Sequence, residues 1–271
     1  MKLRAIIGYT FREGLARKTI IAFATISTLA LLAQVLLALL MPDTINVGGE
    51  GASQQVNISG SQEVIGQIQA VALGLITFVA TILAVFATAS ILPRVMEKGA
   101  IDLLLSKPVS RGNILLGTTL GAVLIVFANV GYYIGGSWII VGLWSGYWNW
   151  GFLGAVLPIT YMFLVLYSAM MVLSIATRSS ALSMIVIYAH VFLVDPVLEN
   201  RRTLAELTGN DTVKTVMDFF YYPLPKPDAI SKVSTSMVLH LDIPWEPLWT
   251  SGLFACAMFA LAWWMFSKKD F

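Results

Sequence analysis

His190 lies within a long apolar run and Asp195 lies close to its end, so the two side chains could relay a proton across a membrane. Their five-residue separation, however, places them on different faces of a regular helix. Asp195 is followed by Pro196, which is typical of a helix that leaves the apolar part of a bilayer. The sequence favours this second interpretation and keeps the proton relay as the alternative.

Asn129 and Gln34 are polar side chains inside other apolar runs, and we expect them to form hydrogen bonds between helices. The sequence has no HExxH or GxSxG motif and no Cys and His cluster at metal-ligand spacing, which predicts neither a catalytic residue nor a metal site. It also has no phosphate-binding GxxxxGK[ST] loop. The chain is therefore not expected to be an enzyme or to bind a cofactor itself.

The composition indicates which elements position these polar groups. Hydrophobic residues make up 58% of the 271 residues and charged residues only 12%, about half the charged share of a soluble domain. The net charge of +2 and the absence of basic stretches interleaved with aromatics argue against a nucleic-acid partner. The lipid bilayer is the expected environment.

The spacing of charged residues predicts six membrane-spanning helices, because a span needs about 20 apolar residues. The long uncharged interval between Arg111 and Arg178 is split by the glycine- and tryptophan-rich turn at 142–151. We therefore expect a single all-α integral membrane domain, 1–271, with six transmembrane helices, an N-terminal amphipathic interfacial helix and a cytoplasmic coupling helix. The predicted spans are 19–41, 67–92, 113–141, 152–176, 180–198 and 247–267.

Lysine and arginine predict the orientation, since they favour the cytoplasmic side in short loops. They gather in the first 18 residues, in the 94–111 loop, at Arg178 and in the C-terminal tail. Both termini are therefore placed in the cytoplasm and the chain in the cell (inner) membrane. The segment 196–247 is predicted to be extracytoplasmic, with short helices at about 199–208 and 212–222 and a stop at the prolines that follow.

Residues 1–18 are predicted to form a helix that lies in the inner membrane interface, because apolar side chains recur there at helical spacing. A basic anchor without a partner is the alternative. The apolar positions include Leu3, Ile6, Ile7 and Phe11.

The 94–111 loop is predicted to contain a second amphipathic helix. Ile101, Leu104 and Leu105 share one helical face, Pro108 ends the helix and Ser110 caps the next one. Such a helix docks in the groove of a partner, or it lies passively on the membrane. The residues alone leave both roles open.

The same stretch, EKGAIDLLLSKPVSRGNILLG at 97–117, resembles the cytoplasmic loop of type 2 ATP-binding-cassette (ABC) permeases. The shared features are a glutamate, a glycine, a Leu-Leu-Ser-x-Pro-Val-Ser-Arg run and a following Leu-Leu-Gly. The position of the loop between the second and third spans also matches. Thr118 departs from the pattern, where a lysine is common.

This resemblance implies an ABC exporter permease that forms a dimer with a second copy or a sister permease. Separate cytosolic ABC ATPase subunits would bind ATP and Mg²⁺ and contact both the N-terminal helix and the 94–111 loop. Arg94 and Glu97 would supply polar contacts, and the apolar face would enter the ATPase groove. The implied coupling residues are Arg94, Glu97, Gly99, Ile101, Leu104, Leu105, Pro108 and Arg111.

Two other functions stay open. A non-transporting membrane subunit would relay ATPase work to an extracytoplasmic protein. A secondary transporter would be expected to show charged residues at mid-membrane and paired repeats. The predicted spans contain almost no charged residues, and no repeat is evident in the sequence.

Overall fold

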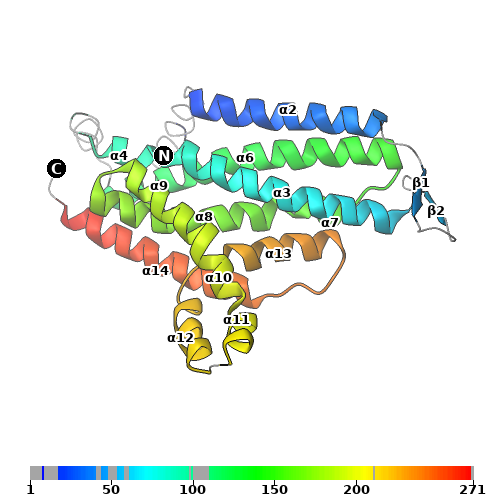
Figure 1. Ribbon diagram of the computed structural model, residues 1–271. Coiled ribbons are helices and arrows are strands. Elements are labelled where there is room, and N and C mark those ends of the chain that lie inside the picture. Colours follow the sequence, from blue (N-terminus) through cyan, green and yellow to red (C-terminus); the bar gives the residue numbers. More distant parts are fainter. Residues whose placement is uncertain are drawn as a thin grey trace.

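The computed structural model describes residues 18–40, 44–47, 54–57, 61–97, 110–209 and 211–269, with Gly8 and Gly99. Long helices run side by side and form one elongated bundle (Figure 1). The predicted interfacial helix at 1–18 and most of the predicted coupling helix lie outside the described residues.

Six helical segments are long and apolar enough to cross a membrane, which confirms the predicted all-α membrane class. Several of them consist of two or three consecutive helices. They are α2 (Lys18–Leu40), α3 (Gln62–Thr88) with α4 (Ile91–Val95), α6 (Arg111–Ser145), α7 (Trp150–Gly154) with α8 (Val156–Thr177), α9 (Ser180–Ala189) with the π-helix η1 (His190–Val194) and α10 (Asp195–Glu199), and α14 (Glu246–Lys268).

Local sequence signals start and stop these helices. The Ser110 side chain accepts a hydrogen bond from the backbone N–H of Asn113 at the start of α6. Gly146 ends α6 with φ +70°, a left-handed conformation that glycine adopts without strain. Asn149 then caps α7, so the chain reverses inside the turn predicted at 142–151.

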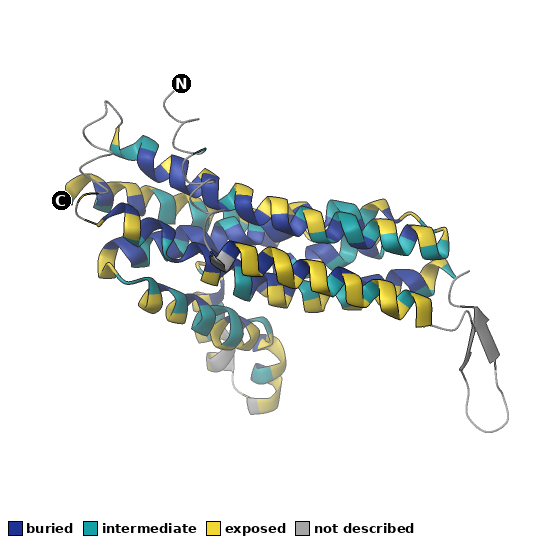
Figure 2. Ribbon diagram, turned by 90° about the horizontal axis from the view of Figure 1, so that it is seen from above, coloured by how far each residue is buried: buried dark blue, intermediate teal, exposed yellow. Residues whose placement is uncertain are grey.

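Helix α8 lies at the centre of the bundle and packs against α6, α9 and α14. Its side chains Phe163, Tyr167 and Ile175 are buried in the main apolar cluster. By contrast, α2 carries a broad exposed face of leucine, isoleucine and valine (Figure 2). Such a surface is compatible with lipid, which covers apolar side chains as well as a protein core does.

A short hairpin, which the sequence analysis does not predict, lies between the first two spans. Strand β1 (Thr44–Val47) pairs antiparallel with β2 (Gln54–Asn57), and Ile45 lies opposite Val56. β-branched residues favour strands, and the glycines between them favour a reversal.

The segment between the fifth and sixth spans contains three helices, α11 (Arg201–Thr208), α12 (Asp211–Tyr221) and α13 (Pro227–Val238). The first two correspond to the predicted short helices, and they project together from the bundle (Figure 1). Helix α13 was missed because its prolines were interpreted only as a stop. Pro227 instead occupies its first turn, where a missing N–H costs nothing.

Candidate functional site

The predicted coupling residues that the structure describes lie at one end of the bundle, where α4 and the start of α6 are found (Figure 1). Arg94 is exposed on α4, and Glu97 is exposed just after it. Gly99 has φ +92°, which favours glycine. The predicted residues Ile101, Leu104, Leu105 and Pro108 lie outside the described residues, as do Leu3, Ile6, Ile7 and Phe11.

Helix α4 has one anchored face and one exposed face. Ile91, Leu92 and Val95 are buried, and α4 packs against α6 and α8. Arg94 points its charge away from this apolar face and is exposed. A partner that binds the exposed face would therefore act on a helix that is held firmly in the core.

Arg111 connects the start of α6 to the end of α14. Its Nη1 donates hydrogen bonds to the backbone carbonyls of Ser267 and Lys269, each at 2.9 Å, and to that of Phe266 at 3.4 Å. These carbonyls lack partners within their own helix because they lie at its C-terminus. Arg111, which the resemblance assigned to ATPase coupling, thus holds the last span at the border of the 94–111 loop.

Lys269 extends this connection to α8. Its Nζ donates a hydrogen bond to the carbonyl of Ile175, near the C-terminus of α8. Burial, together with the nearby Arg178 charge, lowers the pKa of the Lys269 ammonium. Two basic side chains therefore tie the ends of α6, α14 and α8 together. The sequence analysis predicted neither bond, because the partners are far apart in the chain.

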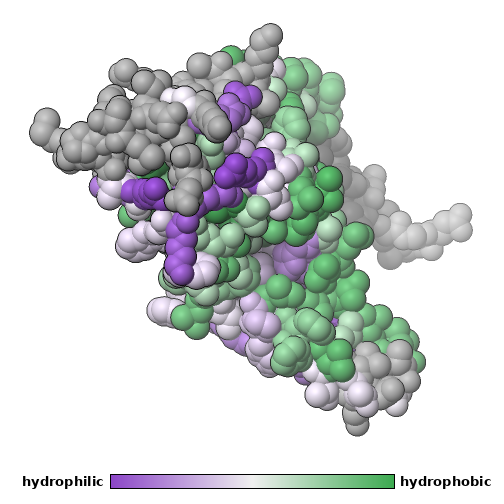
Figure 3. All heavy atoms as spheres, turned by 90° about the vertical axis from the view of Figure 1, so that its left-hand side faces the viewer, coloured by the Kyte–Doolittle hydropathy of each residue, from purple (hydrophilic) through white to green (hydrophobic). Residues whose placement is uncertain are grey.

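The same end is polar at its surface. Figure 3 looks onto it and shows hydrophilic side chains gathered there, whereas apolar side chains cover much of the flank. Lys268 lies over the Trp264 ring, with 4.4 Å between the ammonium and the ring centroid. This pairing of a cation with an aromatic ring suits the boundary between lipid and water.

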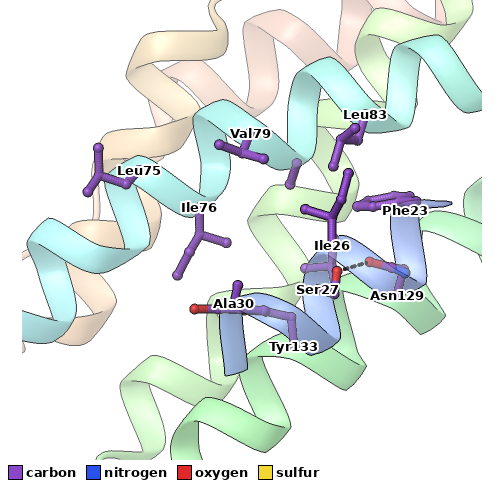
Figure 4. A pocket seen from close by; sticks show the side chains of 12 residues that line it. Phe23, Ile26, Ser27, Ala30, Leu75, Ile76, Val79, Leu83, Asn129 and Tyr133 are labelled. Atoms are coloured by element: carbon purple, nitrogen blue, oxygen red, sulfur yellow. Dashed lines mark hydrogen bonds between the residues drawn. The ribbon is translucent and has the colours of Figure 1, made fainter. Parts of the chain in front are cut away.

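Asn129 forms the predicted kind of interhelical bond. It is buried on α6, and its Oδ1 accepts a 2.8 Å hydrogen bond from the Ser27 hydroxyl of α2 (Figure 4). The pair borders an apolar cavity of about 160 Å³ between α2, α3 and α6. Phe23, Ile76 and Leu83 are among the side chains around it (Figure 4). This hydrogen bond accounts for the buried amide of Asn129 without a catalytic or ligand-binding role.

His190 begins η1, Asp195 follows η1 as the first residue of α10, and the two bond to different groups. The His190 Nε2 lies 3.0 Å from the carbonyl oxygen of Pro225, which only accepts, so Nε2–H donates. The Asp195 Oδ2 accepts a 2.8 Å hydrogen bond from the backbone N–H of Asp228. No hydrogen bond joins His190 to Asp195 in the described part of the chain.

Beyond Asp195, a charged network joins α10, α11, α12 and α13. Lys232 lies 2.7 Å from the Glu199 carboxylate and 3.0 Å from that of Asp228. Arg201 donates to Asp218 at 2.6 Å and stacks on the ring of Tyr221. The Tyr221 hydroxyl donates to Glu199 at 3.1 Å, and burial together with that carboxylate raises the pKa of Tyr221 to about 12.

Lys226 is the least compensated charge of this region. Its side chain is 2% exposed, and its ammonium has no hydrogen-bond partner in the structure. The Glu246 carboxylate lies 3.9 Å away, and the Tyr221 ring centroid lies 4.3 Å away. Burial lowers the pKa of Lys226, against the attraction of Glu246.

Asn149 holds the opposite end of the bundle together. Its Nδ2 donates to Gln69 Oε1 on α3 at 2.9 Å and to the carbonyl of Val238 on α13 at 3.0 Å. The sequence alone places Asn149 only in the turn at 142–151. A single amide side chain thus fixes α7 against two other helices.

One comparison with known proteins agrees with this architecture. The family model described as ABC-2 family transporter protein matches residues 6–271. No curated protein matches the chain. The family match confirms the resemblance carried by the 97–117 stretch. Because the match covers nearly all 271 residues, the chain belongs to the ABC-2 transporter family and is a multi-pass permease subunit of an ABC transporter.

Proposed function

We propose that this chain is the permease of an exporter that works with separate cytosolic ATPase subunits. These subunits bind ATP and Mg²⁺ and contact the 94–111 loop, and their closure moves a substrate across the inner membrane. The family match supports the ATPase association in general terms. The lysine and arginine distribution supports cytoplasmic termini.

One observation carries the coupling proposal, namely the three hydrogen bonds from Arg111 Nη1 to the backbone carbonyls at the end of α14. Force applied between Glu97 and Ser110 would reach α3 along the chain, and α6 and α8 through the buried face of α4. It would reach α6 directly and α14 through Arg111, while Lys269 would pass it to α8. The loop would therefore act on most of the bundle at once, because packed helices transmit displacement instead of absorbing it.

The second permease copy, or a sister permease, would complete the path on an apolar flank of the bundle. The described residues leave broad faces of α2 and α14 exposed, which is compatible with lipid and with a helical partner. The secondary transporter is not supported by the family match. An extracytoplasmic partner is a second candidate, because α11 and α12 project from the bundle and expose Phe219 and Phe220 (Figure 1).

The test is co-purification of the ATPase with the permease in mild detergent. We expect Glu97→Lys to lower ATPase recovery about tenfold, since reversing a charge at a binding surface costs about 1–2 kcal/mol. Glu63→Lys is the matched control, because Glu63 is exposed at the far end of the same span and carries the same charge. Equal recovery with both variants would contradict the assignment of the loop.

Arg111→Met separates binding from transmission. This variant should keep the ATPase, because Arg111 bonds to α14, and it should speed hydrogen exchange of the backbone amides in the last turn of α14. Lys268→Met is the control, since it removes a charge from the same end without removing the bonds to the three carbonyls. Unchanged exchange in Arg111→Met would show that the connection does not hold α14.

A further inference from the structure

A cavity of about 440 Å³ lies between α3, η1, α10 and α13, at the side of the bundle where α13 packs against α3. This volume is typical of small-molecule sites. One part of its wall is polar and the rest is apolar. The polar side chains are Thr77, Thr81, Asp195, Asp228 and Ser231, and the apolar ones include Phe78, Met162, Val191 and Phe192.

Asp195 is the buried charge of this cavity. It is 2% exposed, and the N–H of Asp228 donates to its Oδ2. No described side chain donates to Oδ1. The ammonium of Lys232 is already bonded to Glu199 and Asp228. Arg201 pairs with Asp218, and Lys226 faces Glu246. The described lining of the cavity therefore carries two carboxyl groups, those of Asp195 and Asp228, and no basic side chain.

Thr77 provides an independent sign of a missing ligand. It is 4% exposed, it lines the cavity, and its hydroxyl has no hydrogen-bond partner in the structure. Buried threonines elsewhere in the spans, such as Thr81 and Thr88, donate to the carbonyl four residues earlier. A buried hydroxyl without a partner is uncommon and costs about 1–3 kcal/mol.

Another part of the wall is formed by a π-helical turn. Val191 and Phe192 belong to η1, and the Phe192 ring packs on the Phe78 ring with centroids 5.0 Å apart. Single π-helical turns inside α-helices frequently occur at functional sites. Here the turn places aromatic surface next to the buried carboxylate, and the two together suit a ligand with one charged and one apolar part.

We propose that this cavity binds an amphiphilic amine. Its protonated nitrogen would lie between the Asp195 carboxylate and the Thr77 hydroxyl, and its apolar body would contact Phe78, Met162 and Phe192. An ammonium satisfies both polar groups, because it donates three hydrogen bonds. The headgroup of an aminophospholipid fits less well, since its phosphate would lie near the carboxylate of Asp228, and Lys232, the cation bonded to that carboxylate, is also paired with Glu199.

The experiment measures binding of radiolabelled 2-phenylethylammonium to the purified permease in nanodiscs of phosphatidylcholine, by equilibrium dialysis. The neutral 2-phenylethanol is the matched probe without charge. No ATP or ATPase is needed, so the result does not depend on the proposed transport function. We expect the wild type to bind the ammonium at least tenfold more tightly than the alcohol.

Two near-isosteric variants test the assigned groups. Asp195→Asn should raise the Kd for the ammonium about tenfold or more, and Thr77→Val should raise it several-fold. Asp242→Asn, which makes the same change at an exposed position in the loop before α14, should leave the Kd unchanged. Circular dichroism and size-exclusion profiles identify any variant that fails to fold, in which case the other variant decides.

Three outcomes would overturn the proposal. Equal binding of the ammonium and the alcohol to the wild type would exclude a charge-selective site. An unchanged Kd in folded Asp195→Asn would exclude the carboxylate as the partner. Much weaker binding of the ammonium to the wild type in phosphatidylethanolamine nanodiscs than in phosphatidylcholine nanodiscs would assign the site to a lipid headgroup instead of a free amine.

Discussion

At the scale of single residues, the polar groups of this permease differ in how well they are compensated. Asn129 and Asn149 are satisfied by hydrogen bonds across helices. Lys226 keeps a buried ammonium without a hydrogen bond, near one carboxylate and two tyrosine rings. A buried charge of this kind is weak evidence for stability, because desolvation offsets much of the attraction between the charges.

Lys226→Met should therefore stabilise the protein, since methionine keeps the apolar stem and removes the ammonium. We expect the melting temperature to rise by about 2–4 °C at pH 7. The folded-state pKa of Lys226 is lowered from 10.5, so the folded state loses this proton first, and the stability of the wild type rises with pH up to about 10.5. Thermal melts from pH 7 to 10.5 should show the gain of the variant shrinking as pH rises. A constant or growing gain would contradict a desolvated ammonium.

At the scale of elements, helix α7 approaches α13 more closely than a side chain allows. A Cβ atom at Gly151 would lie 1.9 Å from the backbone carbonyl oxygen of Met237. Because that oxygen belongs to the backbone, it cannot move aside as a flexible side chain would. Gly151 thus allows Asn149, two residues earlier, to reach the carbonyl of Val238.

Gly151→Ala should lower the free energy of unfolding by about 1–3 kcal/mol, the usual cost of overpacking. Gly74→Ala is the matched control, because a Cβ there would meet nothing within 4 Å. It should be neutral or stabilise by about 0.5–1 kcal/mol, since glycine weakens a helix interior. Denaturation of both variants in the same detergent provides the comparison. A smaller loss for Gly151→Ala than for Gly74→Ala would refute the close approach.

At the scale of the whole molecule, charge separates the two ends of the bundle. The end with α4, Arg111 and Lys269 also carries Arg94 and Arg178, whereas the 42–66 segment at the other end has no lysine or arginine. Short basic loops resist translocation, so the basic end should face the cytoplasm.

Cysteine labelling of intact cells tests this orientation in a Cys256→Ser background. A membrane-impermeant maleimide should label Asp242→Cys from outside and Glu97→Cys only after the cells are permeabilised. Both positions are exposed, so a difference in labelling reports the side of the membrane and not burial. Labelling of Glu97→Cys in intact cells would invert the predicted topology and remove the ATPase from the 94–111 loop.

The sequence by itself determined the membrane class, the six spans and the family. A bilayer excludes charge over a fixed thickness, so the spacing of charged residues reveals the spans without knowledge of packing. The family followed from a contiguous stretch, 97–117, and the match at 6–271 confirms it. Helix α13 and the β1–β2 hairpin were missed, because Pro227 marks a start as readily as a stop and the strands are short.

Only the tertiary structure decided which polar groups meet. Arg111 donates hydrogen bonds to carbonyls more than 150 residues away in the sequence. Asp195 of α10 accepts a hydrogen bond from the N–H of Asp228 of α13, with α11 and α12 between them in the chain. No local pattern encodes such pairs, because they depend on how whole helices pack. The sequence alone therefore relates Asp195 only to His190 along one helix, whereas the fold places it in the lining of a cavity to which Thr77 of another span also contributes.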